Sequence, residues 1–104
     1  MVYNGPMIEI IKSETFDRWL LNLKDRIGRA RIQARIDRLA GGNPGDTKSL
    51  RDGLFELRID HGPGYRVYFI RRGQVTLILL AGGDKSTQDA DIERALRIAE
   101  DWED

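Results

Sequence analysis

The chain has 104 residues, 40% of them hydrophobic, and its 17 basic residues balance 17 acidic residues. This length fits one compact domain, which we assign to residues 1–104. The absence of cysteine excludes disulfides, thiolate nucleophiles and cysteine-ligated metals, and the single histidine, His61, argues against a histidine cage, so no cofactor or metal is expected. No apolar run approaches the roughly 20 residues that span a membrane. A secretory signal pattern is also missing, so we expect a cytoplasmic protein with no membrane partner.

Charge is distributed unevenly along the chain. Residues 1–83 contain 14 lysines and arginines against 9 acidic residues, whereas residues 84–104 contain 3 against 8. This asymmetry indicates either a basic working surface or simply solvated helices that differ in charge. Charge alone does not choose between these two interpretations.

The first part of the chain predicts a strand followed by a helix hairpin. Residues 7–12 (MIEIIK) have the β-branched pattern of a short strand. Ser13 is suited to cap a helix with apolar positions at Phe16, Trp19, Leu20 and Leu23. Gly28 interrupts this pattern, and a second helix then runs to about Leu39, with a basic side formed by Arg29, Arg31, Arg35 and Arg38. The glycine-rich segment 41–45 ends it, so the two helices form a hairpin that is expected to pack on a sheet.

Three consecutive segments predict an antiparallel sheet. Residues 54–60 (LFELRID) alternate strictly between apolar and polar side chains, and residues 65–71 (YRVYFIR) form the next strand after a turn at residues 61–64. A tight turn at Arg72-Gly73 leads to residues 74–81 (QVTLILLA), which are almost wholly apolar and therefore expected to be buried on both faces. Gly82-Gly83 is expected to end this strand.

A final helix completes the predicted fold. Ser86 or Thr87 is placed to cap it, and its candidate buried residues are Ala90, Ala95, Ile98 and Trp102. The fold class is therefore α+β: an N-terminal strand, a helix hairpin, a three-stranded antiparallel sheet and a C-terminal helix. We expect a helical layer on one face of the sheet and a partly open opposite face.

Alternation places a set of polar side chains on that open face: Glu56, Arg58, Arg66 and Tyr68. Lys85 follows the apolar strand, and Lys48 and Arg51 precede the first strand of the three. RNA cleavage by attack of the 2′-hydroxyl needs a base, cations that stabilise the charge on the phosphate, and an acid for the leaving oxygen. Arginine suits the second task because its planar group binds phosphate oxygens in pairs. The same residues are also compatible with an ordinary solvated face that carries cross-strand ion pairs.

The acid and base remain open among three residues. Glu56 is either a base or a partner that holds Arg58 or Arg66 in place. Tyr68 is a candidate for stacking on a nucleobase or for donating a proton. Histidine is the residue type suited to proton transfer near neutral pH, which makes His61 a candidate, but its glycine-rich turn is also typical of an exposed turn residue.

Three stretches together resemble the RelE/ParE toxin superfamily: residues 50–59 (LRDGLFELRI), residues 62–69 (GPGYRVYF) and residues 79–88 (LLAGGDKSTQ). The resemblance is closest to the branch of addiction-module killer proteins, also known as phage Gp49-like or HigB-like toxins. It implies the RelE fold and the activity of a type II toxin: a metal-independent endoribonuclease (mRNA interferase) that cuts mRNA on the ribosome and inhibits translation.

The resemblance also implies site residues. Arg66 matches the family's phosphate-binding arginine, Arg58 a basic residue on the preceding strand, and Lys85 a basic residue after the last strand. Arg51 matches an arginine in the family's Leu-Arg-x-Gly segment. With Tyr68 and Glu56, which alternation places on the same face, Arg66, Arg58 and Lys85 form the candidate catalytic set. The candidate RNA-binding residues are Arg51 and three further cations from the sequence pattern: Lys48, Arg29 and Arg35. Residues 86–104 lack the C-terminal tyrosine of RelE and the histidines of the better-studied HigB type, and Glu56 stands where RelE has a lysine.

Two other functions are compatible with the same resemblance. One is a ParE-like toxin that inhibits DNA gyrase through protein contacts, because fold does not settle function. The other is an inactive toxin that acts only within an antitoxin-bound, DNA-binding repressor complex. In each case the resemblance implies that the partner is a small helix-turn-helix antitoxin of the HigA kind. For the nuclease it also implies binding to the ribosome and to mRNA. DNA is expected to be contacted only indirectly, through the antitoxin complex.

Overall fold

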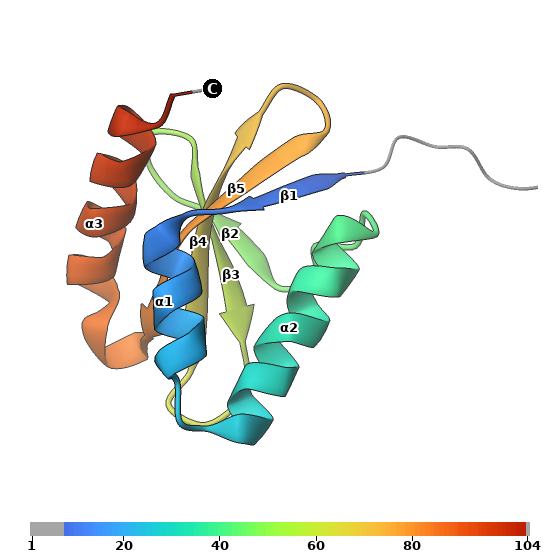
Figure 1. The fold of residues 1–104 in the computed structure, drawn as a ribbon, viewed down its shortest axis with the longest axis vertical. Coiled ribbons are helices and arrows are strands. Elements are labelled where there is room, and N and C mark those ends of the chain that lie inside the picture. The colour runs from blue at the N-terminus through green and yellow to red at the C-terminus, as the bar shows by residue number, and fades with distance from the viewer. Residues whose placement is uncertain (1–7, 104) are drawn as a thin grey trace, which may run out of the picture.

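The computed structural model describes residues 8–103, which form a five-stranded sheet and its covering helices (Figure 1). The elements in chain order are β1 (Glu9–Lys12), α1 (Glu14–Asn22), α2 (Arg26–Ala40), β2 (Thr47–Ser49), β3 (Leu54–Ile59), β4 (Tyr65–Arg72), β5 (Thr76–Asp84), a short 3₁₀ helix η1 (Lys85–Thr87) and α3 (Gln88–Asp101). Met7, which the sequence placed in the first strand, lies outside the described residues. Within the described residues, no helix combines the length and the apolarity required to cross a bilayer.

The predicted antiparallel trio is confirmed as β3, β4 and β5, and two further strands extend it. The strand order is β1-β5-β4-β3-β2, with β1 parallel to β5 and the other pairs antiparallel. The short polar strand β2 was not predicted, because three residues carry too little pattern to identify a strand. The α+β class and the order of the predicted elements are as expected.

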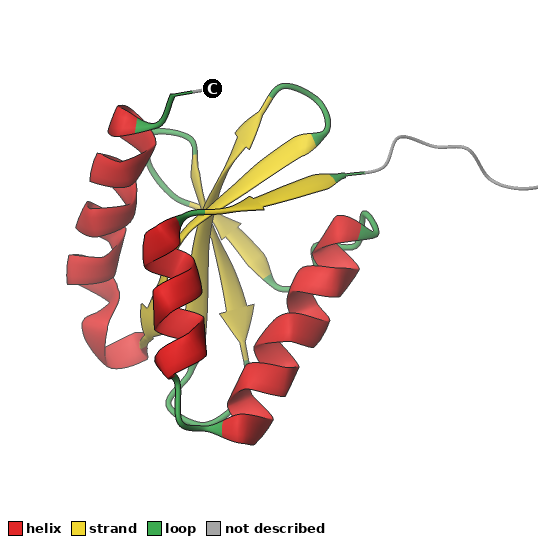
Figure 2. Cartoon of the chain, viewed as in Figure 1, coloured by secondary structure: helices red, strands yellow, loops and turns green. Residues whose placement is uncertain are grey.

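Helices cover both faces of the sheet, so the prediction of one covered and one partly open face is wrong (Figure 2). Helices α1 and α2 pack on the face that carries Leu57, Val67 and Leu79. Helix α3 packs on the opposite face, against Tyr68 and Leu80 among others. The reason is that β5 is apolar on both faces, and the apolar side of α3 has to cover the second one.

The starts of the first two helices depend on polar caps. The Ser13 hydroxyl accepts a hydrogen bond from the Phe16 amide at 3.0 Å and donates to the Leu80 carbonyl at 2.6 Å, which confirms the predicted cap. The predicted interruption at Gly28 is wrong, because α2 begins at Arg26 with Asp25 as its cap. Gly28 lies in the first turn of α2, where an added Cβ would be 2.7 Å from the Tyr65 ring.

The end of β5 also differs from the prediction. Gly82 and Gly83 continue the strand to Asp84 instead of ending it. Neither position has room for a side chain: a Cβ on Gly82 would overlap the Trp19 ring, and one on Gly83 would overlap the Asp91 carboxylate. The two glycines therefore allow α1 and α3 to approach β5 from opposite sides.

Candidate functional site

Three predicted cations meet at one end of the sheet. Arg58 on β3 and Arg66 on β4 are register partners, and Arg66 is in turn the partner of Gly83 on β5. Lys85 follows β5 directly. Arg58, Arg66 and Lys85 line one groove of about 410 Å³, together with Asp46, Ile59, Asp60, Gly62, Pro63 and Gly64. We refer to it as the basic groove.

A buried carboxylate, Glu56, contacts the side chains of both arginines. Its side chain is 1% exposed, and its Oε1 accepts a hydrogen bond from Arg58 Nε at 3.0 Å and lies 3.8 Å from Arg66 Nε. Its Oε2 accepts from Gln88 Nε2 at 2.8 Å. Burial raises the pKa of Glu56, but the hydrogen bonds from Gln88 and Arg58 and the positive charges of Arg58 and Arg66 outweigh it, so the pKa is lowered. Glu56 is therefore ionised at neutral pH and placed as a partner of the arginines.

Arg66 is folded back onto its own turn. Its Nη1 donates to the carbonyl oxygens of Gly64 at 3.0 Å and Tyr65 at 3.1 Å, and its side chain is only 14% exposed. Gly64 has φ +80°, which L side chains rarely adopt, and a Cβ there would lie 3.4 Å from Arg66 Nη1 and 3.5 Å from Lys85 Cβ. Because Gly64 has no side chain, the side chains of Arg66 and Lys85 can both pack against it. Arg58 is more open, at 36% exposure.

Tyr68 does not lie on an open surface as predicted. It is fully buried under α3, in register with Glu56 on β3. Burial, followed by the negative charges of Glu56 and Asp91, raises the pKa of Tyr68. Alternation identified its face correctly, but α3 covers that face, so Tyr68 has no exposed ring on which a nucleobase can stack.

The predicted RNA-binding residues are spread over the molecule. Lys48 is exposed on β2, in register with Glu56. Arg51 is at the other end of β3 from Arg58 and pairs with Glu93 of α3, so it does not belong to the basic groove. Arg35 donates to the carbonyls of Arg58, Pro44 and Asp46 and thereby ties α2 to neighbouring loops. Arg29 is half-buried on α2.

His61 belongs to a different cluster. Its Nε2 lies 3.5 Å from Asp25 Oδ2, which also accepts a hydrogen bond from the Tyr65 hydroxyl at 2.8 Å. Burial and the bond to Asp25 raise the pKa of Tyr65 to about 12, and the Gly28 amide and Tyr65 lower the pKa of Asp25. Tyr65 packs on the α1–α2 side of the sheet, and the His61 ring stacks beside it at a centroid distance of 6.4 Å. His61 therefore contacts this cluster, whereas Arg66 projects from the opposite face of β4.

Sequence reasoning missed the residues that hold Lys85 and the arginines in place. Gln88, the first residue of α3, bonds to Glu56, and no local pattern indicated this contact 32 residues away. The Asp84 side chain accepts from the Ser86 amide at 2.8 Å and Thr87 donates to buried Asp91 at 2.5 Å, so the loop around Lys85 is fixed on both sides. The spacing of Asp84 and Thr87 is that of a capping box, a signal that was available in the sequence. In the part of the chain that the structure describes, no three acidic or histidine side chains are grouped to hold a metal ion.

Sequence comparisons assign this chain to a family. Residues 18–101 match the model of the phage-derived protein family Gp49-like (DUF891). An uncharacterized protein from Haemophilus influenzae is 55% identical over 94 residues, which cover 90% of this chain and 95% of that protein.

Solved structures share the fold at low sequence identity. A double mutant of the Escherichia coli toxin RelE in the free state superposes with a TM-score of 0.69 at 14% identity, covering 88% of this chain and 98% of that one. The RelBE2 toxin–antitoxin complex of Mycobacterium tuberculosis contains a chain with a TM-score of 0.58 at 22% identity, covering 76% and 99%. A conserved hypothetical protein of Helicobacter pylori gives 0.52 at 23% identity, covering 77% and 97%. The chain therefore belongs to the Gp49-like family of phage-derived proteins and has the fold of the toxin RelE.

Proposed function

We propose that this chain is the toxin of a type II toxin–antitoxin pair and cleaves mRNA on the ribosome. The observation that carries the proposal is the basic groove, in which Arg58, Arg66 and Lys85 converge and a buried carboxylate fixes the two arginines. Family membership and the RelE fold support it. Its partner is a small helix-turn-helix antitoxin of the HigA kind, in line with the toxin–antitoxin complex among the structures of similar fold.

The groove suits stabilisation of a phosphate under attack. In this reaction the 2′-oxygen of the substrate forms a bond to phosphorus while the bond to the 5′-oxygen breaks, and negative charge accumulates on the phosphate oxygens. Arg66 and Arg58 offer planar guanidinium groups that bind these oxygens, and Lys85 adds a third charge. Because the arginines are positioned before the substrate arrives, little reorganisation is needed during the reaction.

The proton acceptor is assigned to a carboxylate inside the groove. Glu56 does not suit this role, because it is 1% exposed and engaged by Gln88 and Arg58. Asp46 and Asp60 line the groove with the cations and are exposed. One of them accepts the 2′-hydroxyl proton, and the leaving 5′-oxygen takes a proton from Lys85 or from water.

Induction in cells and mapping of mRNA 5′ ends test the proposal. We expect translation-dependent cuts that disappear in Arg66→Ala and persist in Arg71→Ala, an exposed arginine at the other end of β4. Unchanged cleavage in Arg66→Ala would refute the site. Gyrase-linked DNA damage without mRNA cuts would replace the proposal by a ParE-like function, and normal growth without the antitoxin would replace it by a purely regulatory role.

A further inference from the structure

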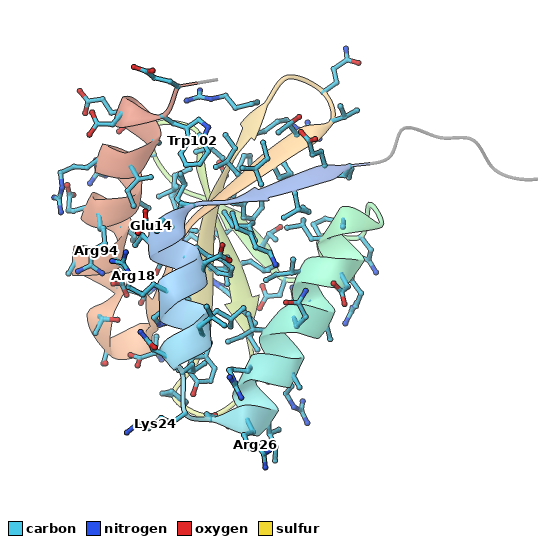
Figure 3. All side chains as sticks on the ribbon, in the orientation of Figure 1. Glu14, Arg18, Lys24, Arg26, Arg94 and Trp102 are labelled. Carbon is cyan, nitrogen blue, oxygen red and sulfur yellow. The ribbon has the colours of Figure 1, made fainter. Side chains whose placement is uncertain are left out.

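A second groove lies between α1 and α3. It has a volume of about 510 Å³ and is lined by Thr15, Arg18, Trp19, Asn22, Leu23, Gly82 and Arg94. Arg18 and Arg94 are labelled in Figure 3, one on each helix. The groove thus combines an aromatic ring, two arginines from different helices, and the small polar side chains of Thr15 and Asn22. The proposed reaction uses none of these residues.

Trp19 forms a fixed wall of this groove. Its ring lies against Gly82, where an added Cβ would overlap it. Phe16 and Tyr65 hold it from the core, with ring centroids 5.9 Å and 6.2 Å away. A half-buried tryptophan in such a fixed position loses little entropy when a flat ring stacks on it.

The two arginines retain donors for a ligand. Arg18 pairs with Glu14 one turn earlier on α1, and Arg94 Nη1 lies 3.6 Å from Asp91 Oδ1 on α3. Each contact involves one guanidinium nitrogen, and the two side chains are 66% and 50% exposed. The pair of Arg18 with Glu14 is exposed on both sides and contributes little free energy, so an anion with several oxygens competes with it readily. Asp91 is buried, and its contact with Arg94 orients the guanidinium group of Arg94 without engaging all of its donors.

The second groove and the basic groove are lined by residues that are near neighbours in sequence at the end of β5. Gly82 is next to Gly83, the register partner of Arg66. The pairing of β1 with β5 ends at Lys12 and Leu79, so within residues 8–103 no strand lies beside the following part of β5 on that edge. Along the chain, only Gly83 and Asp84 separate Gly82 in the second groove from Lys85 in the basic groove.

We propose that the groove formed by Arg18, Trp19 and Arg94 binds a nucleotide of single-stranded RNA next to the cleaved one. Arg18 and Arg94 bind its phosphate, and its base stacks on Trp19, as in other sites that bind single strands without strong sequence preference. This inference rests on the proposed function, since it treats the two grooves as contacts for one RNA strand.

Tryptophan fluorescence tests the inference directly. Trp19 and Trp102 are the only tryptophans, so Trp102→Phe leaves Trp19 as the single reporter. We expect a 2′-O-methylated hexaribonucleotide, which has no 2′-hydroxyl to attack, to quench Trp19. Arg18→Gln or Arg94→Gln is expected to weaken this binding roughly tenfold, the effect of one lost charge-assisted hydrogen bond. The matched control is Arg26→Gln, an arginine at the start of α2 outside this groove, which should leave binding unchanged (Figure 3).

The outcomes separate this inference from the proposed function. Absence of quenching, equal quenching by inorganic phosphate, or equal weakening in Arg26→Gln overturns the inference. If Trp102→Phe does not fold, crosslinking of a 4-thiouridine hexamer to the unaltered chain replaces the titration, and failure to label the Trp19 peptide overturns it. If mRNA cuts occur without quenching, only the inference fails, whereas quenching without cuts refutes the nuclease and leaves an RNA-binding groove.

Discussion

Replacing Glu56 by glutamine removes one negative charge from behind two arginines and changes almost no volume. The amide oxygen can still accept from Arg58 Nε, but the charge-assisted part of that bond and the attraction to Arg66 are lost. A hydrogen bond to a charged group contributes about 1.5–3 kcal/mol to stability. Because Arg58 is 36% exposed and water partly replaces the carboxylate, we expect Glu56→Gln to lower the free energy of unfolding by about 2 kcal/mol at pH 7.

The effect has to depend on pH in one direction. The folded pKa of Glu56 lies below its ordinary value of 4.5, so its ionised form stabilises the fold above about pH 4.5, and this stabilisation is lost as pH falls through the folded pKa. The difference between the native chain and Glu56→Gln is therefore expected to shrink on acidification. Cleavage should fall at least tenfold at pH 7, since misplaced catalytic groups lose rate steeply.

Urea denaturation at pH 7 and at pH 3, followed by tryptophan fluorescence, measures the free energy of unfolding of both chains and its dependence on pH. The matched control is Glu93→Gln, since Glu93 is 57% exposed and pairs with Arg51 away from the groove; its replacement should cost less than about 0.5 kcal/mol. Equal stability of Glu56→Gln and the native chain at pH 7, or a difference that does not change with pH, would refute the role assigned to Glu56.

Three further predictions concern separate parts of the structure. Gly83→Ala should lower the free energy of unfolding by about 3 kcal/mol in urea denaturation, because the new Cβ overlaps a buried carboxylate; a loss below 1 kcal/mol would contradict this packing. Tyr65→Phe should cost about 1 kcal/mol in the same assay through the lost bond to Asp25, and an unchanged midpoint would show that this bond is not formed in solution. Either Asp46→Asn or Asp60→Asn should reduce mRNA cleavage by about 100-fold without changing stability, and full activity in both variants would exclude a carboxylate base in the groove.

Local periodicity predicted what each strand presents to each face. The faces of β3 and β4 are as expected, with Leu57 and Val67 toward α1 and α2 and Arg58 and Arg66 on the other side. Alternation does not report what covers a face, which is why the burial of Tyr68 was missed. The apolar pattern of β5 contained the missing information, since a strand buried on both faces needs helices on both.

Long-range pairing could not be predicted from sequence. The parallel contact of β1 with β5 joins residues more than 60 positions apart and leaves no local signal. The bond from Gln88 to Glu56 is of the same kind, because it depends on where α3 docks. The wrong prediction of a helix break at Gly28 has a different origin. Gly28 has no side chain because Tyr65 and Asp25 pack closely against it, and not because the helix ends there.

The position of β5 has a consequence for biosynthesis. This strand lies between β1 and β4, yet it follows β2, β3 and β4 in the sequence, so β1 has no strand to pair with until β5 has been translated. Strands β2, β3 and β4 pair directly with one another, but β1 joins the sheet only after β5 emerges, and such distant pairing makes completion of the sheet a late event. Lys85 and Gln88 are translated later still. The growing polypeptide thus remains without an assembled basic groove until the residues that follow β5 have been made.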